Sequence, residues 1–322
     1  MKFRTRTCPL KARFLAIAAA IAVLAIGCTS SDTHLTNARN DQLRYFGFAL
    51  VDCGIDDPFD GSARTSYVTE VAPFSNAGHM CASGPADVIV DRLKVMSDHE
   101  MKAVLSVQEV LFLRTQAGLP GHQKYDLHPE FRERWQTFVA ANDLAANHSS
   151  ILAFYVFDEP VWNDVSYAEL KTAADLVKES FPSIPTLIME AYPTIDDLIV
   201  PESIDWIALV RFGILDPNSD EQYRAELRTL KAKRTGPDQK IVIVMDGWWR
   251  ADLHGARGIR EADMAAVARN YYQLAESDPD VVGIAVHAWP GLLTDGRERG
   301  SRNLPQRVVE QQAQIGRIIT RK

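Results

Sequence analysis

The chain has 322 residues, 46% of them hydrophobic, and a formal net charge of −7. This length is enough for one large domain or two ordinary ones with a sizeable core. Five basic residues and no acidic ones precede residue 28, so removal of residues 1–27 would take the net charge from −7 to −12. Nucleic acid is therefore excluded as a natural partner, because phosphate binding needs a basic surface.

Residues 1–27 have the pattern of a signal peptide: a basic start, an apolar segment over 14–26 and a small residue at the cut. The sequence Ala-Ile-Gly-Cys at 25–28 resembles the lipobox of bacterial lipoproteins. The resemblance implies cleavage before Cys28, lipidation of its thiol and anchoring to a membrane. Since no aspartate follows the cysteine, the resemblance also favours the outer membrane, on its periplasmic or cell-surface face. The alternative is plain secretion with an incidental cysteine.

Residues 28–41 are polar and aperiodic and read as a flexible tether. From there, short apolar runs alternate with amphipathic stretches, which we interpret as strands and helices. In chain order, we expect strands over 45–51, 74–80, 103–107, 151–157, 186–189, 206–210, 240–245 and 281–286. The helices are expected over 64–72, 86–99, 129–146, 166–180, 194–199, 220–232, 260–276 and 304–319, with a loop over 112–127.

Eight strands that alternate with helices predict an α/β fold, a (β/α)₈ TIM barrel, as a single domain over 42–322. A doubly wound sheet is the alternative, but it often carries a glycine fingerprint after its first strand. The residues after the strand over 45–51 contain no G-x-G-x-x-G pattern. Composition shows no linker long enough to divide the domain.

The strand over 151–157 is apolar throughout, as expected for a strand buried on both faces of a parallel sheet. Asp158 and Glu159 follow it directly, and Pro160, which cannot donate to a strand ladder, ends it. In a barrel of this type, catalytic groups lie at the carboxyl ends of the strands. These two carboxylates are therefore placed where chemistry is expected.

The other predicted strands also end in polar or aromatic residues. The candidate substrate-binding residues are Asp52, Asn76, Glu109, Asp158, Tyr192, Arg211, Trp248, His287 and Trp289. Acids beside exposed tryptophans suit carbohydrate, because glycoside cleavage uses two carboxyl groups and the apolar faces of sugars stack on aromatic rings. Trp248 and Trp249 cannot both face the barrel mouth, since neighbours on a strand alternate.

On these residues the chain resembles the (β/α)₈ glycoside hydrolases of the large retaining clan, the cellulase and mannanase type. That clan carries Asn-Glu-Pro after strand four, a glutamate after strand seven and often a tryptophan after strand eight. The resemblance implies that Glu159 is the general acid/base, Asp246 the second carboxylate and Trp289 a sugar platform. The resemblance in architecture extends over the whole domain, whereas the resemblance in sequence is limited to these short motifs.

Two departures from the clan pattern leave alternatives open. Asp158 stands where an asparagine is expected, and an ionised aspartate only accepts hydrogen bonds; it could instead hold Arg211. Asp246 is one methylene shorter than the usual glutamate, so Glu190 is an alternative second carboxylate. Retention or inversion, which depend on the spacing of the two carboxyl groups, therefore stay open.

Cys53 and Cys81 follow neighbouring strands of the expected barrel and can form a disulfide, the alternative being two free buried thiols. We expect no metal and no cofactor, because the patterns for phosphate loops and metal-dependent hydrolases are missing. Two functions remain open. The protein is a glycosidase acting on a poly- or oligosaccharide, or a surface lipoprotein that binds glycan on a glycosidase barrel without cutting it.

Overall fold

The computed structural model describes residues 40–61, 63–116, 123–293 and 296–322. The predicted signal peptide, the predicted lipidation site at Cys28 and most of the predicted tether lie outside the described residues. Within the described part of the chain, no helix is long and apolar enough to cross a membrane.

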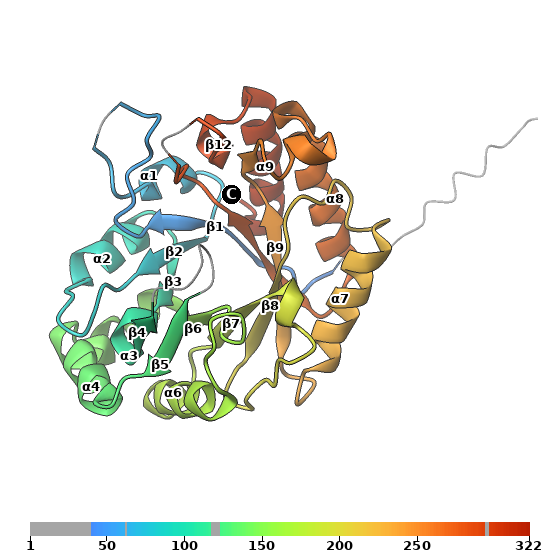
Figure 1. Ribbon diagram of the computed structural model, residues 1–322. Helices are drawn as coiled ribbons and strands as arrows, with labels where there is room; N and C mark the ends of the chain where they lie inside the picture. Colours follow the sequence, from blue (N-terminus) through green and yellow to red (C-terminus); the bar gives the residue numbers. More distant parts are fainter. Residues whose placement is uncertain (1–39, 62, 117–122, 294–295) are drawn as a thin grey trace, which may run out of the picture. The chain divides into compact units, whose positions relative to one another are not determined.

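Eight parallel strands close into a barrel in the order β1-β11-β9-β8-β7-β6-β3-β2 (Figure 1). The barrel strands are β1 (Tyr45–Asp52), β2 (Ala77–Cys81), β3 (Lys102–Ser106), β6 (Ile151–Asp158), β7 (Thr186–Ala191), β8 (Trp206–Val210), β9 (Lys240–Asp246) and β11 (Val281–His287). The closing contact is between the first and last of them, β1 and β11, in parallel register. The predicted (β/α)₈ barrel is confirmed.

Helices surround the barrel and connect its strands (Figure 1). They are α1 (Val68–Val71), α2 (Val90–Asp98), α3 (Gln108–Leu111), α4 (Phe131–Ala141), α5 (Leu144–Asn147), α6 (Tyr167–Ser180), α7 (Glu221–Ala232), α8 (Met264–Ser277) and α9 (Gln306–Thr320). At the start of α6, Ser166 and Glu169 form the capping box that their spacing predicts.

Four sequence predictions of elements need correction. The predicted loop over 112–127 contains two antiparallel strands, β4 (Phe112–Gln116) and β5 (Lys124–Leu127). The expected helix over 129–146 is interrupted where Asp143 adopts a left-handed conformation, and that over 64–72 shortens to the single turn α1. Instead of a helix over 194–199, one 3₁₀ turn covers Tyr192–Thr194, which contains Pro193. Two further strands, β10 (Trp249–Arg250) and β12 (Glu298–Arg299), pair outside the barrel.

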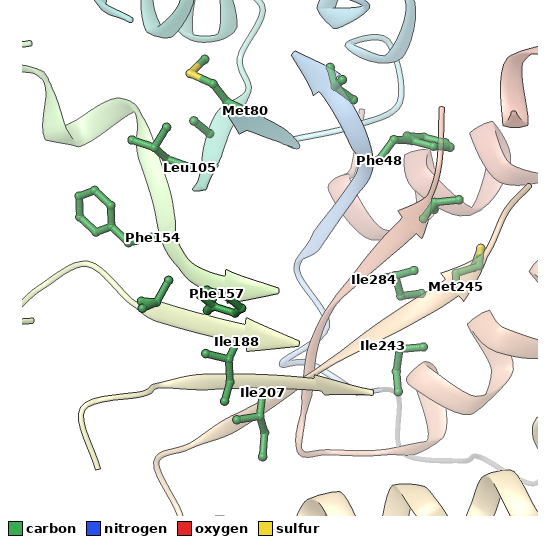
Figure 2. Packing of buried hydrophobic residues seen from close by; sticks show 14 of the residues in the cluster. Phe48, Met80, Leu105, Phe154, Phe157, Ile188, Ile207, Ile243, Met245 and Ile284 are labelled. Carbon is green, nitrogen blue, oxygen red and sulfur yellow. The ribbon is translucent and has the colours of Figure 1, made fainter. Parts of the chain in front are cut away.

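The hydrophobic core has two layers. The larger one lies between strands and helices, and Figure 2 shows the strand side chains that form it, among them Phe48, Phe154, Ile207 and Ile243. The smaller layer lies inside the barrel and includes Tyr155, Leu187, Trp206, Val242 and Val244. Because the interior of a TIM barrel is normally filled by bulky side chains, the residues of this inner layer decide how much space remains there.

Candidate active site

A cavity of about 410 Å³ occupies the barrel interior and extends to the carboxyl ends of the strands, where Asp158, Glu159 and His287 line it. Its wall includes small residues where bulky ones are usual, namely Gly47, Ala77, Gly78, Gly283 and Ala285. At the opposite end the rings of Tyr45 and Trp206 meet with centroids 5.4 Å apart. The cavity thus has an apolar floor, and its polar groups lie towards the mouth.

Asp158 and Glu159 both line this cavity. Asp158 ends β6, and its backbone N–H donates to Gln108 Oε1 at 3.1 Å. The hydroxyl of Tyr155, from the same strand, donates a hydrogen bond to the Asp158 carboxylate. Glu159 has a φ of 55°, a left-handed conformation that is uncommon for a residue with a side chain. This backbone turn brings two consecutive side chains to the same cavity, which an extended strand cannot do.

The environment of Glu159 favours its protonated form. Burial, followed by the negative charges of Asp158 and Glu190, raises the pKa of Glu159 from 4.5 to about 8. The pKa of Asp158 is also raised, because its carboxyl faces the barrel cavity and is poorly solvated by bulk water there, although the hydrogen bond from Tyr155 opposes the shift. At neutral pH the site therefore holds a proton on Glu159, where a general acid needs one.

The wall opposite the acids is aromatic. His287 stacks on Phe212 with ring centroids 4.8 Å apart and meets Trp248 edge to face at 4.9 Å. His79 packs edge to face on Tyr155 at 5.5 Å. Burial lowers the pKa of both histidines to about 4, with the neighbouring His287 adding to the effect on His79. Both imidazoles are therefore neutral and can hydrogen-bond to a ligand without adding charge.

Glu190, one of the two predicted second carboxylates, does not line the cavity and is fully buried. Its oxygens accept hydrogen bonds from the backbone N–H groups of Val161, Trp162 and Ala191 at 2.9, 3.3 and 3.0 Å. The Thr194 hydroxyl adds a fourth at 2.8 Å. Glu190 thus ties the loop that follows Glu159 to the end of β7, a structural role that leaves it no access to a substrate.

Asp246, the other predicted second carboxylate, is also fully buried and outside the cavity wall. Its Oδ2 accepts from the Gly213 N–H at 2.6 Å and lies 2.8 Å from His254 Nε2. Asp246 therefore fastens the segments that follow β8 and β9 to each other. Neither of the positions expected from strands five and seven presents a carboxylate to the cavity.

Three further predicted substrate contacts belong to other parts of the structure. Trp289 is 4% exposed, packs on Phe48 and donates its indole N–H to Glu70 Oε2 at 2.7 Å, so it is a core residue and not a platform. Asp52 is buried in an ion pair with Arg92 at 2.9 Å. Asn76 precedes β2 and bonds the backbone of Arg44 and Phe46, which places it at the amino end of the barrel, away from the mouth.

The remaining predicted contacts divide between rim and cavity. Trp248 and His287 line the cavity, as described above. Tyr192 and Glu109 are exposed but do not line it. Arg211 lies 4.5 Å from the centre of the Tyr192 ring and pairs with Glu226, so it does not hold Asp158.

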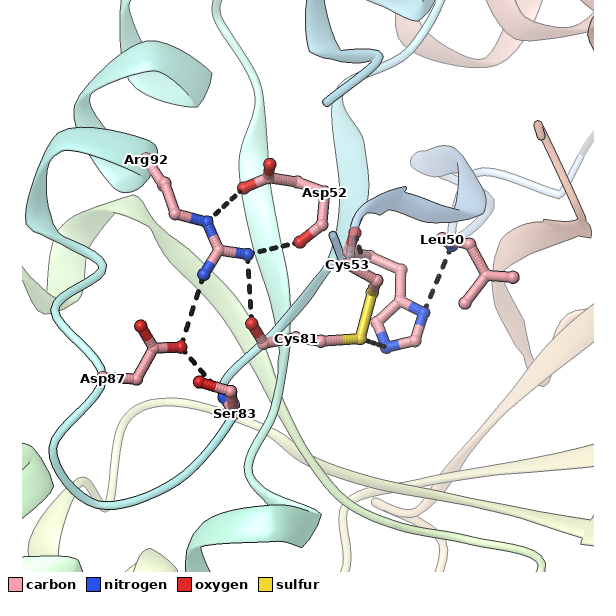
Figure 3. Close-up of a disulfide and its surroundings, with 8 residues drawn as sticks. Leu50, Asp52, Cys53, Cys81, Ser83, Asp87 and Arg92 are labelled. Atoms are coloured by element: carbon pink, nitrogen blue, oxygen red, sulfur yellow. Dashed lines mark hydrogen bonds and ion pairs between the residues drawn. A yellow bond between two sulfur atoms is a disulfide. The ribbon is translucent and has the colours of Figure 1, made fainter. Parts of the chain in front are cut away.

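The structure contains a disulfide between Cys53 and Cys81, at the ends of the adjacent strands β1 and β2 (Figure 3). Arg92 braces the same corner through Asp52, Asp87 and the carbonyl of Cys81. Cys53, His79 and Cys81 are the one cluster with metal-ligand spacing among the described residues. Because both sulfurs are in the disulfide, they offer no thiolate to a metal.

Sequence reasoning missed Tyr155 and Phe212 as cavity residues. Tyr155 lies in the middle of an apolar run and therefore read as core. The available signal was its hydroxyl, since a buried tyrosine usually needs a hydrogen-bond partner and the next polar side chain along the strand is Asp158.

No protein-family model matches the chain, and no curated protein sequence matches it. Among solved structures, it is similar to xylanase 10B from Thermotoga maritima, with 14% identity, a TM-score of 0.52 and coverage of 87% of this chain and 97% of the xylanase. A GH113 β-1,4-mannanase has 12% identity and a TM-score of 0.53, with 87% and 98% covered.

A β-glucuronidase from an uncultured Clostridium sp. has 10% identity and a TM-score of 0.57 over 86% of this chain. The chain spans half of that longer enzyme. At identities this low, the similarity establishes the barrel fold and does not extend to the reaction.

Proposed function

We propose that the protein is a glycoside hydrolase in which Glu159 is the general acid. The observation that carries the proposal is the placement of Asp158 and Glu159, which both line a cavity at the carboxyl end of the fourth barrel strand. Substrates of TIM-barrel enzymes bind at this end. The fold similarity to xylanase and mannanase structures agrees with it.

The chemistry follows from the protonation of the pair. Cleavage of a glycosidic bond requires a proton on the leaving oxygen as the C1–O bond breaks. Glu159 supplies it, since its raised pKa keeps the carboxyl protonated at neutral pH. Positive charge then develops at the anomeric carbon. The carboxylate of Asp158, which lies close enough to Glu159 to raise its pKa, is placed to stabilise that positive charge.

The aromatic wall supports a sugar as the ligand. Trp248 and Phe212 present ring surface to the cavity, and the neutral imidazoles of His79 and His287 offer hydrogen bonds. Sugars need both kinds of contact, because their rings have apolar C–H faces and polar edges.

The test is hydrolysis of a panel of polysaccharides and aryl glycosides by wild type and by Glu159→Gln. The matched control is Glu202→Gln, an exposed glutamate before β8, at the amino end of the barrel. We expect wild type and the control to release reducing ends and Glu159→Gln to lose the activity. If all three proteins bind glycan and none cleaves it, the protein is a glycan-binding module and the proposal is wrong.

We also propose that the chain is exported and anchored through a lipid on Cys28, on the basis of the motif at 25–28. Expression in a bacterium with labelled palmitate tests this. Label should enter the wild type in the membrane fraction, whereas Cys28→Ser should lack label and leave that fraction. Equal fractionation of both proteins without label would contradict the proposal.

A further inference from the structure

The two carboxylates of the cavity come from one strand. Among the described residues that line it, Asp158 and Glu159 are the only acids. The walls formed by β8, β9 and β11 carry Phe212, Trp248 and His287 instead. Glu190, near the end of β7, and Asp246, at the end of β9, are fully buried and hydrogen-bonded to protein.

This arrangement lacks one part of the usual retaining mechanism. There, one carboxyl group protonates the leaving oxygen and a second, across the scissile bond, attacks the anomeric carbon. Asp158 and Glu159 both line the cavity at the end of β6, so both carboxyl groups reach a bound sugar from the same wall. The described cavity wall offers no carboxylate for attack from the other side.

We infer that the substrate supplies the nucleophile and that the protein acts on β-linked 2-acetamido-2-deoxy sugars. This inference rests on the proposed function and specifies its substrate class. An acetamido group on C2 places its carbonyl oxygen beside C1, where an intramolecular attack has a high effective concentration. Attack from behind the leaving group requires that group to be trans to the acetamido group. In gluco- and galacto-configured sugars this condition selects the β anomer.

The bond changes are as follows. The acetamido oxygen forms a bond to C1, the bond from C1 to the leaving oxygen breaks, and the Glu159 proton passes to that oxygen. The product is a cyclic oxazolinium ion, or an oxazoline if its N–H proton moves to Asp158. Water then attacks C1 and gives a proton to the Glu159 carboxylate, and the bond from C1 to the acetamido oxygen breaks. Where the oxazoline has formed, Asp158 returns its proton to the nitrogen, so that the acetamido group is restored.

The position of Asp158 suits it to accept a hydrogen bond from the acetamido N–H. The carboxylate is open to the cavity, and Tyr155 fixes it by donating a hydrogen bond. An acetamido N–H is the donor that such an acceptor recognises, and the bond strengthens as positive charge develops on the nitrogen. An aspartate is required for this role, since the side-chain oxygen of an asparagine would carry no charge.

The cavity next to Asp158 suits the rest of the group. Met189 pairs with Asp158 in the strand register and Leu187 pairs with Tyr155, and both side chains line the cavity. An acetyl methyl group buries its surface favourably against such side chains. The charged acceptor and the apolar wall therefore lie side by side, as an acetamido group requires.

The test compares aryl β-glycosides of N-acetylglucosamine, N-acetylgalactosamine, glucose and mannose, with wild type and Asp158→Asn. For the acetamido sugar that reacts, a series with zero to three fluorines on the acetyl group is added. We expect cleavage of an acetamido glycoside and a fall in kcat/KM of roughly 10²-fold or more across the series, because fluorine weakens the internal nucleophile. The thiazoline derived from the same sugar, which mimics the cyclic intermediate, should inhibit wild type.

Asp158→Asn should lose about 10²–10³-fold in kcat on the acetamido substrate and most of its affinity for the thiazoline. The matched control is Asp98→Asn, at the exposed end of α2, which should leave both unchanged. Faster cleavage of a glucoside or mannoside, or a flat fluorine series, would overturn the inference and leave the proposed glycosidase standing. Absence of cleavage for every glycoside would overturn both.

Discussion

Asp158 and Glu159 are neighbours in the chain, and both side chains face the same cavity. The positive φ of Glu159 makes this possible. This backbone conformation costs on the order of 1 kcal/mol or more, and contacts with the surrounding structure offset it. The Glu159 N–H donates to the Met189 carbonyl at 2.8 Å, and the next residues of the loop are fixed by Glu190. The close approach of the two acids couples their ionisation.

Activity should depend on pH with a falling limb near pH 8. A general acid works only while protonated, so the contribution of Glu159 is complete at low pH and is lost as the pH rises through its pKa of about 8. The rising limb reports ionisation of Asp158, whose pKa is raised, and should therefore lie above pH 3.8. The profile of kcat/KM in buffers from pH 4 to 10 measures both limbs. A falling limb below pH 6 would contradict this assignment of Glu159.

Glu159→Gln should stabilise the protein in alkaline solution. The pKa of Glu159 is higher in the folded state than its ordinary value of 4.5, so the folded state binds the proton more tightly. Stability from this group is therefore present below pH 4.5 and is lost as the pH rises through about 8. A glutamine side chain has nearly the same shape as glutamate but no charge. The substitution should therefore increase the free energy of unfolding at pH 9, by a few kcal/mol at most.

Urea unfolding of both proteins at pH 5 and pH 9 measures this difference. The gain should be larger at pH 9, and Glu202→Gln should show no such dependence. An equal or smaller gain at pH 9 would mean that the Glu159 carboxylate is not destabilised in the folded state.

The sequence contained enough information for the barrel and for the importance of β6, but not for the whole site. Leu152, Tyr155 and Asp158 all line the cavity although they are three residues apart, because the pairing of β6 is irregular on both sides. Simple alternation along a strand would place Tyr155 and Asp158 on opposite faces. Such irregularities depend on neighbouring strands and cannot be located from one strand's sequence.

The side-chain directions of Glu190 and Asp246 also depend on the tertiary structure, so the sequence placed both acids wrongly. A strand-end position is a place along the chain and not a direction in space. Glu190 is the penultimate residue of β7 and Asp246 ends β9, yet both carboxylates accept hydrogen bonds from backbone N–H groups that need acceptors. The hydrogen-bond demand of loops that fold over the barrel is a property of the tertiary structure. Trp289 likewise follows β11 but fills the core against Phe48.

Glu190→Gln should lower both stability and the pKa of Glu159. The amide cannot accept all four hydrogen bonds that Glu190 receives, so buried N–H groups lose their partner at a cost of about 2–4 kcal/mol. Loss of the Glu190 charge also removes one cause of the raised pKa of Glu159. Chemical unfolding measures the first effect. The second should move the falling limb of the pH profile to lower pH, and an unmoved limb would contradict it.

Trp248 and Trp289 should differ in what they contribute. Trp248→Phe shortens a side chain in the cavity wall and should raise KM several-fold with little change in stability. Trp289→Phe leaves the Glu70 carboxylate without its 2.7 Å hydrogen bond and should lower the free energy of unfolding by about 1–3 kcal/mol with KM unchanged. Steady-state kinetics and unfolding of both variants separate the two roles. A raised KM for Trp289→Phe alone would restore it as the sugar platform.

Loss of the disulfide should destabilise the fold. The Cys53–Cys81 bond closes a segment with a sequence separation of 28. For a loop of this length, the unfolded chain gains conformational freedom worth about 3 kcal/mol when the bond is absent. The double variant Cys53→Ala/Cys81→Ala should therefore melt at a lower temperature than the oxidised wild type. It should melt at the same temperature as the wild type in which the disulfide has been reduced. Equal melting of oxidised wild type and variant would contradict this contribution.

The central claim is that Glu159 delivers the proton to the leaving oxygen. Aryl glycosides with poor and with activated leaving groups test it most directly, because a dinitrophenolate departs without protonation. For Glu159→Ala we predict a loss of about 10²–10⁴-fold in kcat on a substrate with an alkyl leaving group and little loss on the dinitrophenyl glycoside. Equal loss on both substrates, or none on either, would contradict the assignment of Glu159 as the general acid.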